Sequence, residues 1–373
     1  MNDTFTFLLL VLLTLANGIM NCNQSSDNRG NDNRYTFPEE SEWHEGTWLQ
    51  WPHHYQYGLQ YRKDLDPTWV DLTKALVQSE RVHIIAYNQK EKDRIIKLLH
   101  NASVDLKLVD FKLYPTDDFW IRDNGPIYVR DNEGNLVILD WGFNAWGNKA
   151  DFKKCNSIPS KIGRDQNKKV IDLNKVMINE GGSIEVDGRG TLMACKSSVL
   201  NPNRNPNMSQ NEAEEIFHTY LGVDNFIWLD GQPGLEITDQ HIDGFARFAN
   251  SSTIVTLSRK DLLEYDVLSS DIEKLYSAKN YKDEPYSFLQ LPLTKNNVVT
   301  TYGKDLAYKG SYCNFYIANT KVLVPIYEDP HDQKAIALIQ RLYPQREVVG
   351  IDFRNVYAHG GMVHCVTQQQ AAE

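Results

Sequence analysis

The stretch "RVHIIAYNQKEKDRIIKLLHN", residues 81–101, carries the alternation that decides the fold class. Its first part, residues 81–88, is rich in β-branched side chains, which is typical of a buried strand. Its second part places Ile95, Leu98 and Leu99 on one face of a helix. A strand followed at once by a helix is the building unit of an α/β fold.

Outward from this stretch, strand and helix patterns alternate about five times. Further strands are expected at residues 106–111, 125–131, 135–141, 175–188, 190–195, 226–231, 245–258, 314–327 and 347–353. Helices are expected at residues 209–222, where Ser209 is the cap and Gly222 the stop, and at residues 331–344, which end at Pro344. No glycine-rich nucleotide loop accompanies them, so this α/β pattern is not that of a dinucleotide-binding fold.

The composition is that of a soluble globular protein. Of the 373 residues, 41% are hydrophobic and 24% are charged, without low-complexity bulk. The formal charge of −10 argues against nucleic acid as a partner and is compatible with a cationic substrate. No long linker interrupts residues 37–373, and a domain of that length favours a repeated architecture around one shared centre.

The N-terminus predicts export. Residues 5–15 form an apolar run too short to span a bilayer, and residues 16–18 offer a small-x-small cleavage site. We therefore expect a signal peptide over residues 1–18, a disordered tether over residues 19–36 and a single catalytic domain over residues 37–373. The protein is accordingly expected to be secreted or periplasmic.

Two other interpretations of the N-terminus stay open. The apolar run could act as an N-terminal membrane anchor. Cys22 raises the alternative of a lipoprotein, although residues 19–21 lack the small side chains expected before such a cysteine. No later segment has the pattern of a membrane span.

Four stretches end an expected strand with charged residues bounded by glycine. They are "DDFWIRDNGP" (117–126), "NEGGSIEVDG" (179–188), "EITDQHIDGFARF" (236–248) and "HGGMVHC" (359–365). Strand ends are where side chains converge on a shared site. The four stretches therefore predict one polar site built from distant parts of the chain.

Cys365, in the last of these stretches, is the candidate nucleophile. A free thiol has a pKa of about 8.5, so it needs a nearby base or cation to react at neutral pH. His241 can supply the base or a proton, and on an expected strand His241 and Asp243 point to the same face. Asp123 and Glu180 add two carboxylates, and such a set would bind a planar guanidinium bidentately.

Each of these residues also has a plainer explanation. A free cysteine is more often part of the core, and the five cysteines (Cys22, Cys155, Cys195, Cys313 and Cys365) show no CxxC motif. A metal hydrolase using His241, Asp243, His359 and His364 is conceivable, but no HExxH or comparable ligand spacing occurs. In a papain-like protease the cysteine precedes the histidine, which is the reverse of the order here.

Six motifs in a fixed order carry a family resemblance. They are "EWHEGTWLQWPH" (42–53), "DFWIRDNGP" (118–126), "EGGSIEVDGRGTL" (180–192), "LNPNRNP" (200–206), "TDQHIDGFARF" (238–248) and "GGMVHCVTQQQ" (360–370). From Phe37 to the C-terminus, the chain resembles the agmatine deiminase and bacterial-type peptidyl-arginine deiminase family, within the guanidine-modifying pentein superfamily.

The resemblance implies a five-bladed, pseudosymmetric α/β propeller, the pentein fold, in which each blade is a small mixed sheet with a helix outside. It also implies that Cys365 is the nucleophile and His241 the general acid and base. Asp123 and Asp243 would clamp the guanidinium, and Glu180 would orient either His241 or the far nitrogen of the substrate. No metal or organic cofactor is implied.

The substrate implied is agmatine, converted to N-carbamoylputrescine and ammonia through a thiouronium on Cys365. Trp48, Trp51 and Trp120 are expected to flank the substrate's alkyl chain, with core packing as the alternative. Gln240 departs from the glycine usual in agmatine deiminases, which leaves a peptidyl-arginine deiminase open. A non-catalytic binding protein for guanidine ligands is the alternative of another class, and homo-oligomer formation also stays open.

Overall fold

Short mixed sheets and flanking helices alternate along residues 34–373, the part of the chain that this computed structural model describes. The strands are β1 His44–Gln50, β2 Arg81–Ala86, β3 Val109–Leu113, β4 Ile127–Arg130, β5 Leu136–Gly142, β6 Val170–Ile178, β7 Ile184–Val186, β8 Thr191–Cys195, β9 Asn225–Leu229, β10 Ala246–Asn250, β11 Thr253–Leu257, β12 Ser287–Leu291, β13 Leu293–Val299, β14 Asp305–Ser311, β15 Tyr316–Ile317, β16 Lys321–Ile326, β17 Glu347–Asp352 and β18 Gln368–Ala371.

The α-helices are α1 His54–Leu76, α2 Gln89–Asn101, α3 Ile121–Asn124, α4 Ala145–Asn148, α5 Ile158–Gln166, α6 Lys196–Val199, α7 Gln210–Leu221, α8 Arg259–Glu264, α9 Ser269–Tyr276, α10 Asp332–Leu342 and α11 Arg354–Tyr357. Short 3₁₀ helices are η1 Leu106–Leu108, η2 Cys155–Ser157, η3 Gly181–Ser183, η4 Ile242–Gly244 and η5 His364–Val366. Within this part of the chain, no helix combines the length and apolarity that crossing a bilayer requires.

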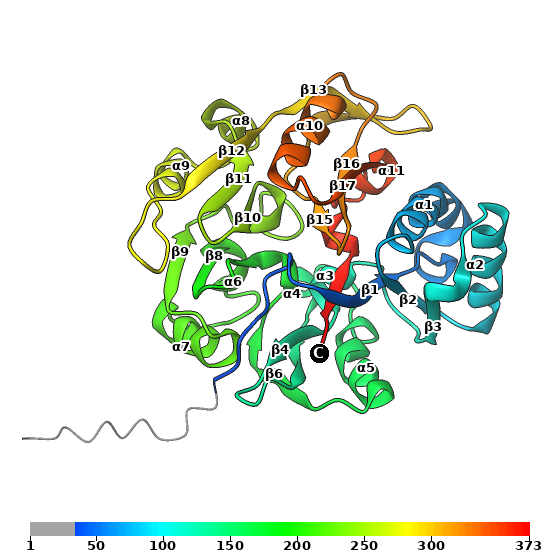
Figure 1. The fold of residues 1–373 in the computed structure, drawn as a ribbon, viewed down its shortest axis with the longest axis horizontal. Coiled ribbons are helices and arrows are strands. Elements are labelled where there is room, and N and C mark those ends of the chain that lie inside the picture. The colour runs from blue at the N-terminus through cyan, green and yellow to red at the C-terminus, as the bar shows by residue number, and fades with distance from the viewer. Residues whose placement is uncertain (1–33) are drawn as a thin grey trace, which may run out of the picture. The chain divides into compact units, whose positions relative to one another are not determined.

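One structural unit occurs five times among the described residues. Each copy has an antiparallel strand pair extended by a parallel strand: β4-β5-β6, β7-β8-β9, β10-β11-β12, β15-β16-β17 and β18-β1-β2, the last widened by β3. Because a parallel pair needs a crossover connection, a helix lies between its two strands in every copy. Figure 1 shows the five sheets following one another around a common centre, with α2, α5, α7 and α9 on the outside.

The ring is closed by the two ends of the described chain. Strand β18 pairs antiparallel with β1, so that Trp48 lies opposite Gln368. Gln370 adds side-chain bonds across this closure, since its Oε1 accepts from Trp48 Nε1 at 3.1 Å and from Tyr128 Oη at 2.9 Å. The glutamines after Cys365 therefore form a buried strand that fixes the segment carrying this cysteine to the start of the domain.

Most of the expected elements are present, with differences where turns intervene. Helix α7 has Ser209 as its cap, in a capping box with Glu212, and ends at Gly222 with φ of 72°. Residues 245–258 and 314–327, expected as continuous strands, are hairpins: β10 with β11, and β15 with β16.

The N-terminal boundary lies slightly earlier than expected. Tyr35 is buried, and its backbone N–H donates to Thr219 O at 3.1 Å, so residues 34–36 belong to the folded unit. The expected signal peptide, residues 1–18, and the tether up to residue 33 lie outside the described residues.

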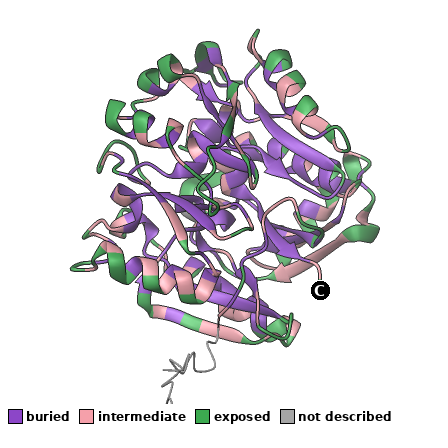
Figure 2. Ribbon diagram, turned by 60° about the vertical axis from the view of Figure 1, so that its left-hand side comes forward, coloured by how far each residue is buried: buried purple, intermediate pink, exposed green. Residues whose placement is uncertain are grey.

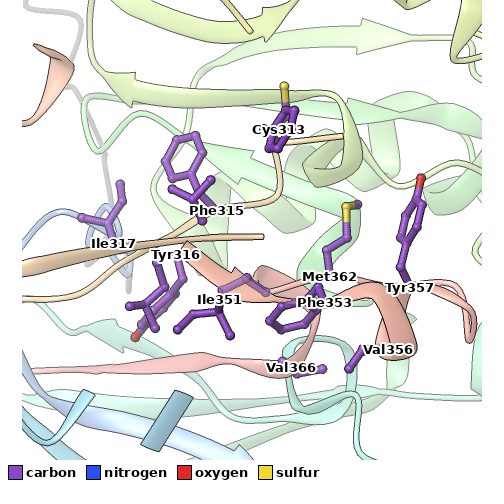
Figure 3. Packing of buried hydrophobic residues seen from close by; sticks show 14 of the residues in the cluster. Cys313, Phe315, Tyr316, Ile317, Ile351, Phe353, Val356, Tyr357, Met362 and Val366 are labelled. Atoms are coloured by element: carbon purple, nitrogen blue, oxygen red, sulfur yellow. The ribbon is translucent and has the colours of Figure 1, made fainter. Parts of the chain in front are cut away.

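Central strands such as β5 and β8 are buried, while outer strands such as β6 and β14 and the outer faces of the helices are partly exposed (Figure 2). The core continues under Cys365, because Met362 and Val366 on either side of it are buried in the main hydrophobic cluster. Figure 3 shows them packed near Phe353 and Ile351, from the end of β17. This packing fixes the segment that carries the thiol.

Candidate active site

Cys365 lies in η5, between helix α11 and strand β18, and is partly exposed. Its thiol donates to Asn314 Oδ1 at 3.5 Å, and its Sγ lies 4.0 Å from Asp243 Oδ2. Gly361, four residues earlier, must lack a side chain, because a Cβ there would lie 2.2 Å from Cζ3 of Trp120. Gly361 thus allows Trp120 to lie against the segment that carries Cys365.

His241 lies immediately before η4, with both ring nitrogens facing carboxylates. Its Nε2 is 3.0 Å from Glu180 Oε2, and its Nδ1 is 3.6 Å from Asp123 Oδ1. Burial alone lowers the pKa of His241, but Asp123 and Glu180 raise it to about 9. At neutral pH the imidazole is therefore protonated and can act as a proton donor.

Glu180 is held behind His241 by Arg204, from the motif at residues 200–206. Arg204 Nε donates to Glu180 Oε1 at 2.9 Å and Arg204 Nη2 to Oε2 at 3.2 Å, and both side chains are buried. Burial raises the pKa of Glu180, but His241 and Arg204 outweigh it, so the net shift is downward. Glu180 is therefore an ionised acceptor that fixes the orientation of His241.

Asp123 lies in α3 and faces the same point as His241. Its Oδ2 accepts from Trp146 Nε1 at 2.9 Å, and its Oδ1 accepts from the Gly182 backbone N–H at 3.1 Å. Burial raises the pKa of Asp123 to about 6, with a further upward contribution from the Asp243 charge. The charge of His241 opposes this shift, so the carboxylate is ionised at neutral pH with the protonated imidazole as the cation beside it.

Gly182 shows how closely these side chains converge. A Cβ at this position would lie 2.7 Å from His241 Nδ1. It would also lie 2.9 Å from Asp123 Oδ1 and 3.0 Å from Asp243 Oδ2. Any side chain at residue 182 would fill the space between them, which gives the Glu-Gly-Gly sequence a physical reason.

Asp243 is oriented by a buried chain of charged groups. Its Oδ2 is 2.7 Å from His364 Nδ1, and His364 Nε2 is 2.7 Å from Glu40 Oε2. Glu40 in turn pairs with Arg122 at 3.2 Å and Arg247 at 3.1 Å. Burial raises the pKa of Asp243, but the bond with His364 outweighs it, so the net shift is downward and Asp243 is ionised.

Two cavities meet at the thiol. The larger, of about 770 Å³, is lined by Cys365, His241, Asp243 and Asn314 among others. The smaller, of about 340 Å³, is lined by Cys365, Trp120, Asp123 and Trp146 among others. Burial and then the charges of Asp243 and Asp123 raise the pKa of the Cys365 thiol well above its usual value. Without a bound cation, Cys365 is therefore a neutral thiol.

The structure brings together Cys365, His241, Asp123, Asp243 and Glu180, the set expected from the sequence. The expected strand geometry of His241 and Asp243 is wrong, because residues 242–244 form a 3₁₀ helix and β10 begins only at Ala246. Both side chains face the site nonetheless, since the tight turn brings them to the same side of Gly182.

Two of the three expected tryptophans are not in the site. Trp48 is fully buried in β1, where it stacks on His83 with ring centroids 4.5 Å apart. Trp51 is buried in the core, and its Nε1 donates to Asp66 Oδ1 at 2.8 Å. Neither lines either cavity, so core packing is the correct alternative for both, while Trp120 does line the smaller cavity.

Trp48→Ala is expected to lower the free energy of unfolding by about 3–5 kcal/mol, the usual cost of removing a large buried aromatic side chain. Denaturant unfolding measures this loss. The KM of the variant should stay within about twofold of the original value, because no contact with either cavity is removed. An unchanged unfolding free energy with a raised KM would instead place Trp48 in the site.

Several contributing residues were not expected from the sequence. Asn314 begins the hydrophobic stretch at residues 314–327 and belongs to none of the polar stretches, although its side chain contacts Cys365. Glu40 lies near the N-terminus, far along the chain from its partner His364. Trp146 lies in none of the motifs singled out from the sequence. Arg204 lies in the motif at residues 200–206, and this position was the only signal that could have indicated it.

The backbone at Gln240 has a conformation that favours glycine, so the glutamine here is accommodated at a cost. This residue has φ of 74°, in the left-handed region where glycine is favoured, and Asp239 before it has φ of 62°. A non-glycine residue there costs about 1 kcal/mol. Its N–H donates to Glu236 Oε1 at 2.6 Å, which helps hold the conformation just before His241.

The histidines considered as metal ligands serve other purposes. His364 is shared between Asp243 and Glu40, and His359 packs edge-on against Tyr61 with ring centroids 4.5 Å apart. Across residues 34–373, no three His, Cys, Asp or Glu side chains are grouped as the ligands of a metal ion would be.

Comparison with known proteins agrees with this geometry. The profile of the Porphyromonas-type peptidyl-arginine deiminase family matches residues 36–371. The agmatine deiminase of Pseudomonas aeruginosa (strain UCBPP-PA14) is 30% identical over 361 residues, which cover 91% of this chain and 96% of that protein.

Solved structures extend the similarity to the fold. A structure of the agmatine deiminase of C. jejuni with substrate bound is 27% identical, with a TM-score of 0.77 and coverage of 91% of this chain and 96% of that one. That of Enterococcus faecalis is 24% identical, with a TM-score of 0.80 and coverage of 90% and 95%. The pentein fold is thereby confirmed. The chain belongs to the Porphyromonas-type peptidyl-arginine deiminase family and is a hydrolase acting on C–N bonds of the guanidine group.

Proposed function

We propose that this protein is an agmatine deiminase, which hydrolyses agmatine to N-carbamoylputrescine and ammonia. The observation that carries the proposal is the position of Cys365, at the junction of two cavities with a protonated His241 and two ionised carboxylates around it. The curated name of the P. aeruginosa relative supports agmatine as the substrate.

Binding is the first step. Asp123 and Asp243 flank the space in front of Gly182, and both are acceptors suited to the planar N–H groups of a guanidinium. The incoming cation offsets the two negative charges that raise the pKa of the Cys365 thiol. The thiol then releases its proton to solvent and becomes a thiolate, because a nearby cation favours the charged form.

The chemistry follows in two halves. The Cys365 thiolate forms an S–C bond to the guanidinium carbon, and His241 donates its proton to a terminal nitrogen, which leaves as ammonia. The substrate carbon stays on sulfur as an S-alkylthiouronium. The now neutral His241 takes a proton from water, the water oxygen bonds to the same carbon, and the C–S bond breaks. Breaking the C–S bond restores the Cys365 thiolate and leaves a proton on the new oxygen of the product. This proton passes to the released ammonia, and the neutral ureido product leaves the site.

One assay separates the alternatives. The purified protein is incubated with agmatine, free arginine and an arginine-containing peptide, and ureido groups are measured. We expect product from agmatine. Citrulline formed in the peptide alone would make the protein a peptidyl-arginine deiminase, and absence of product from all three would favour a non-catalytic guanidine-binding protein.

We also propose that the protein is secreted or periplasmic, on the basis of the apolar run at residues 5–15 and the small residues after it. The N-terminal sequence of the mature protein tests this. Cleavage near residue 18 is expected, while a mature chain that retains residues 1–18 would contradict it.

A further inference from the structure

The smaller cavity leads from the nucleophile to a second carboxylate, Asp118. Beyond the residues already described, its walls include two tyrosines, Tyr57 and Tyr61. Its volume of about 340 Å³ suits a small ligand. A cavity with aromatic walls and a carboxylate suits an alkyl chain that ends in a cation.

The carboxylate of Asp118 lies in the wall of the smaller cavity and accepts two hydrogen bonds. It is partly exposed; its Oδ1 accepts from the Phe119 N–H at 2.9 Å, and its Oδ2 accepts from Tyr57 Oη at 2.9 Å. Burial raises its pKa to about 7, with hydrogen bonds from Phe119 and Tyr57 opposing the shift. None of the described residues that line this cavity is a lysine or an arginine, so no fixed cation neutralises the carboxylate from within the cavity.

The larger cavity, unlike the smaller one, has a cationic side chain in its wall. It contains Lys309, which is paired with Glu264 at 2.7 Å, together with Glu236 and Asp266. His241 also faces this cavity and not the smaller one. The nitrogen that His241 protonates therefore departs on this side.

The division of the two cavities around Cys365 sets the direction of the substrate. If the leaving nitrogen points to His241, the substituted nitrogen and its chain point away from it. The opposite side is the smaller cavity, beside Trp120 and Asp123. A chain running along it ends at Asp118 and Tyr57.

We propose that Asp118, positioned by Tyr57, binds the terminal ammonium of the substrate and selects guanidines with a cationic tail over those whose tail carries a carboxylate. The inference rests on the proposed deiminase function and adds the residue that binds the far end of the substrate. Free arginine is disfavoured because its α-carboxylate would lie against Asp118 with no cation in the cavity to pair with it.

The test compares two substrates that differ only at the tail: agmatine and butylguanidine, which lacks the amine. Asp118→Asn should lower kcat/KM for agmatine by about 10–100-fold, chiefly through KM, because a bond to a charged group is lost. For butylguanidine the same change should stay within about threefold. Asp93→Asn, a matched carboxylate-to-amide change at an exposed residue of α2 that lines neither cavity, should leave kcat/KM for both substrates within about twofold.

Equal losses for both substrates would show that Asp118 is structural, and no loss for agmatine would place the ammonium elsewhere; either result overturns the proposal. Calorimetric binding of agmatine to the Cys365→Ala protein, with and without Asp118→Asn, separates this inference from the proposed function. A 10–100-fold rise in Kd is expected even if no ureido product forms, and an unchanged Kd overturns it. Absence of turnover by the unsubstituted protein contradicts only the deiminase activity.

Discussion

Cys365→Ala is expected to abolish ureido formation from agmatine while the protein still binds the substrate. The thiol is the nucleophile in the proposed reaction, and nothing in the clamp can replace it. Loss of a nucleophile that acts together with its proton donor costs more than about 10⁴-fold in kcat. Agmatine binding should persist because Asp123 and Asp243, which would hold the guanidinium, are unchanged. Single-turnover detection of ammonia measures the first loss, and calorimetry measures the binding.

Cys195→Ala is the matched control. Cys195 is fully buried in β8 and lines neither cavity, so the same change of side chain should leave kcat within about twofold. Ureido product from the Cys365→Ala protein at a rate comparable to that of the control would contradict the assignment of the nucleophile.

The alternation of strands and helices could be predicted because it is a local property. In residues 81–101 the hydrophobic pattern changes from a buried run to helical spacing, and the structure has β2 and α2 there. The pairing of β18 with β1 could not be predicted in this way. It joins segments more than three hundred residues apart, and a hydrophobic period carries no information on which distant strand is the partner.

The residues of the candidate site also differ in whether a local sequence pattern indicates them. Strand ends bounded by glycine indicated Asp123, Glu180 and His241, because charge beside flexible backbone is unusual in a core. The tryptophans gave no such signal. Trp48 in the core and Trp120 in a cavity wall are both almost fully buried, and only the three-dimensional surroundings distinguish them.

The residues that contact the site from distant parts of the chain could not be identified from the sequence either. Glu40 and His364 form one buried contact, and each alone is an ordinary polar residue. The buried carboxylate of Glu40 is stable only when the two arginines that pair with it are in place. Its role is therefore a property of the assembled network and not of its position in the sequence. For the same reason Asn314 could not be assigned before its contact with Cys365 was known.

His241→Ala is expected to lower kcat by about 10²–10⁴-fold, the usual contribution of a general acid and base. In the unsubstituted protein, kcat/KM should rise with pH between about 6 and about 7, as Asp123 and then Asp118 lose their protons and can bind the cationic groups of the substrate. It should fall as pH passes about 9, where His241 loses the proton that the leaving nitrogen needs. The pH–rate profile of agmatine turnover measures both limbs.

Substitutions show which ionisable group is responsible for each limb of the pH–rate profile. The alkaline limb belongs to His241, so His241→Ala should remove it and leave a slow reaction that no longer falls near pH 9. The acidic limb should move to lower pH in a variant that removes a neighbouring negative charge, Asp243→Asn, because like charge is one of the causes that raise the pKa of Asp123. His218→Ala, on the exposed face of α7, is the control and should preserve both limbs. A His241→Ala protein that retains the full alkaline limb would assign the essential proton to another group, and the order of chemical steps proposed here would then be wrong.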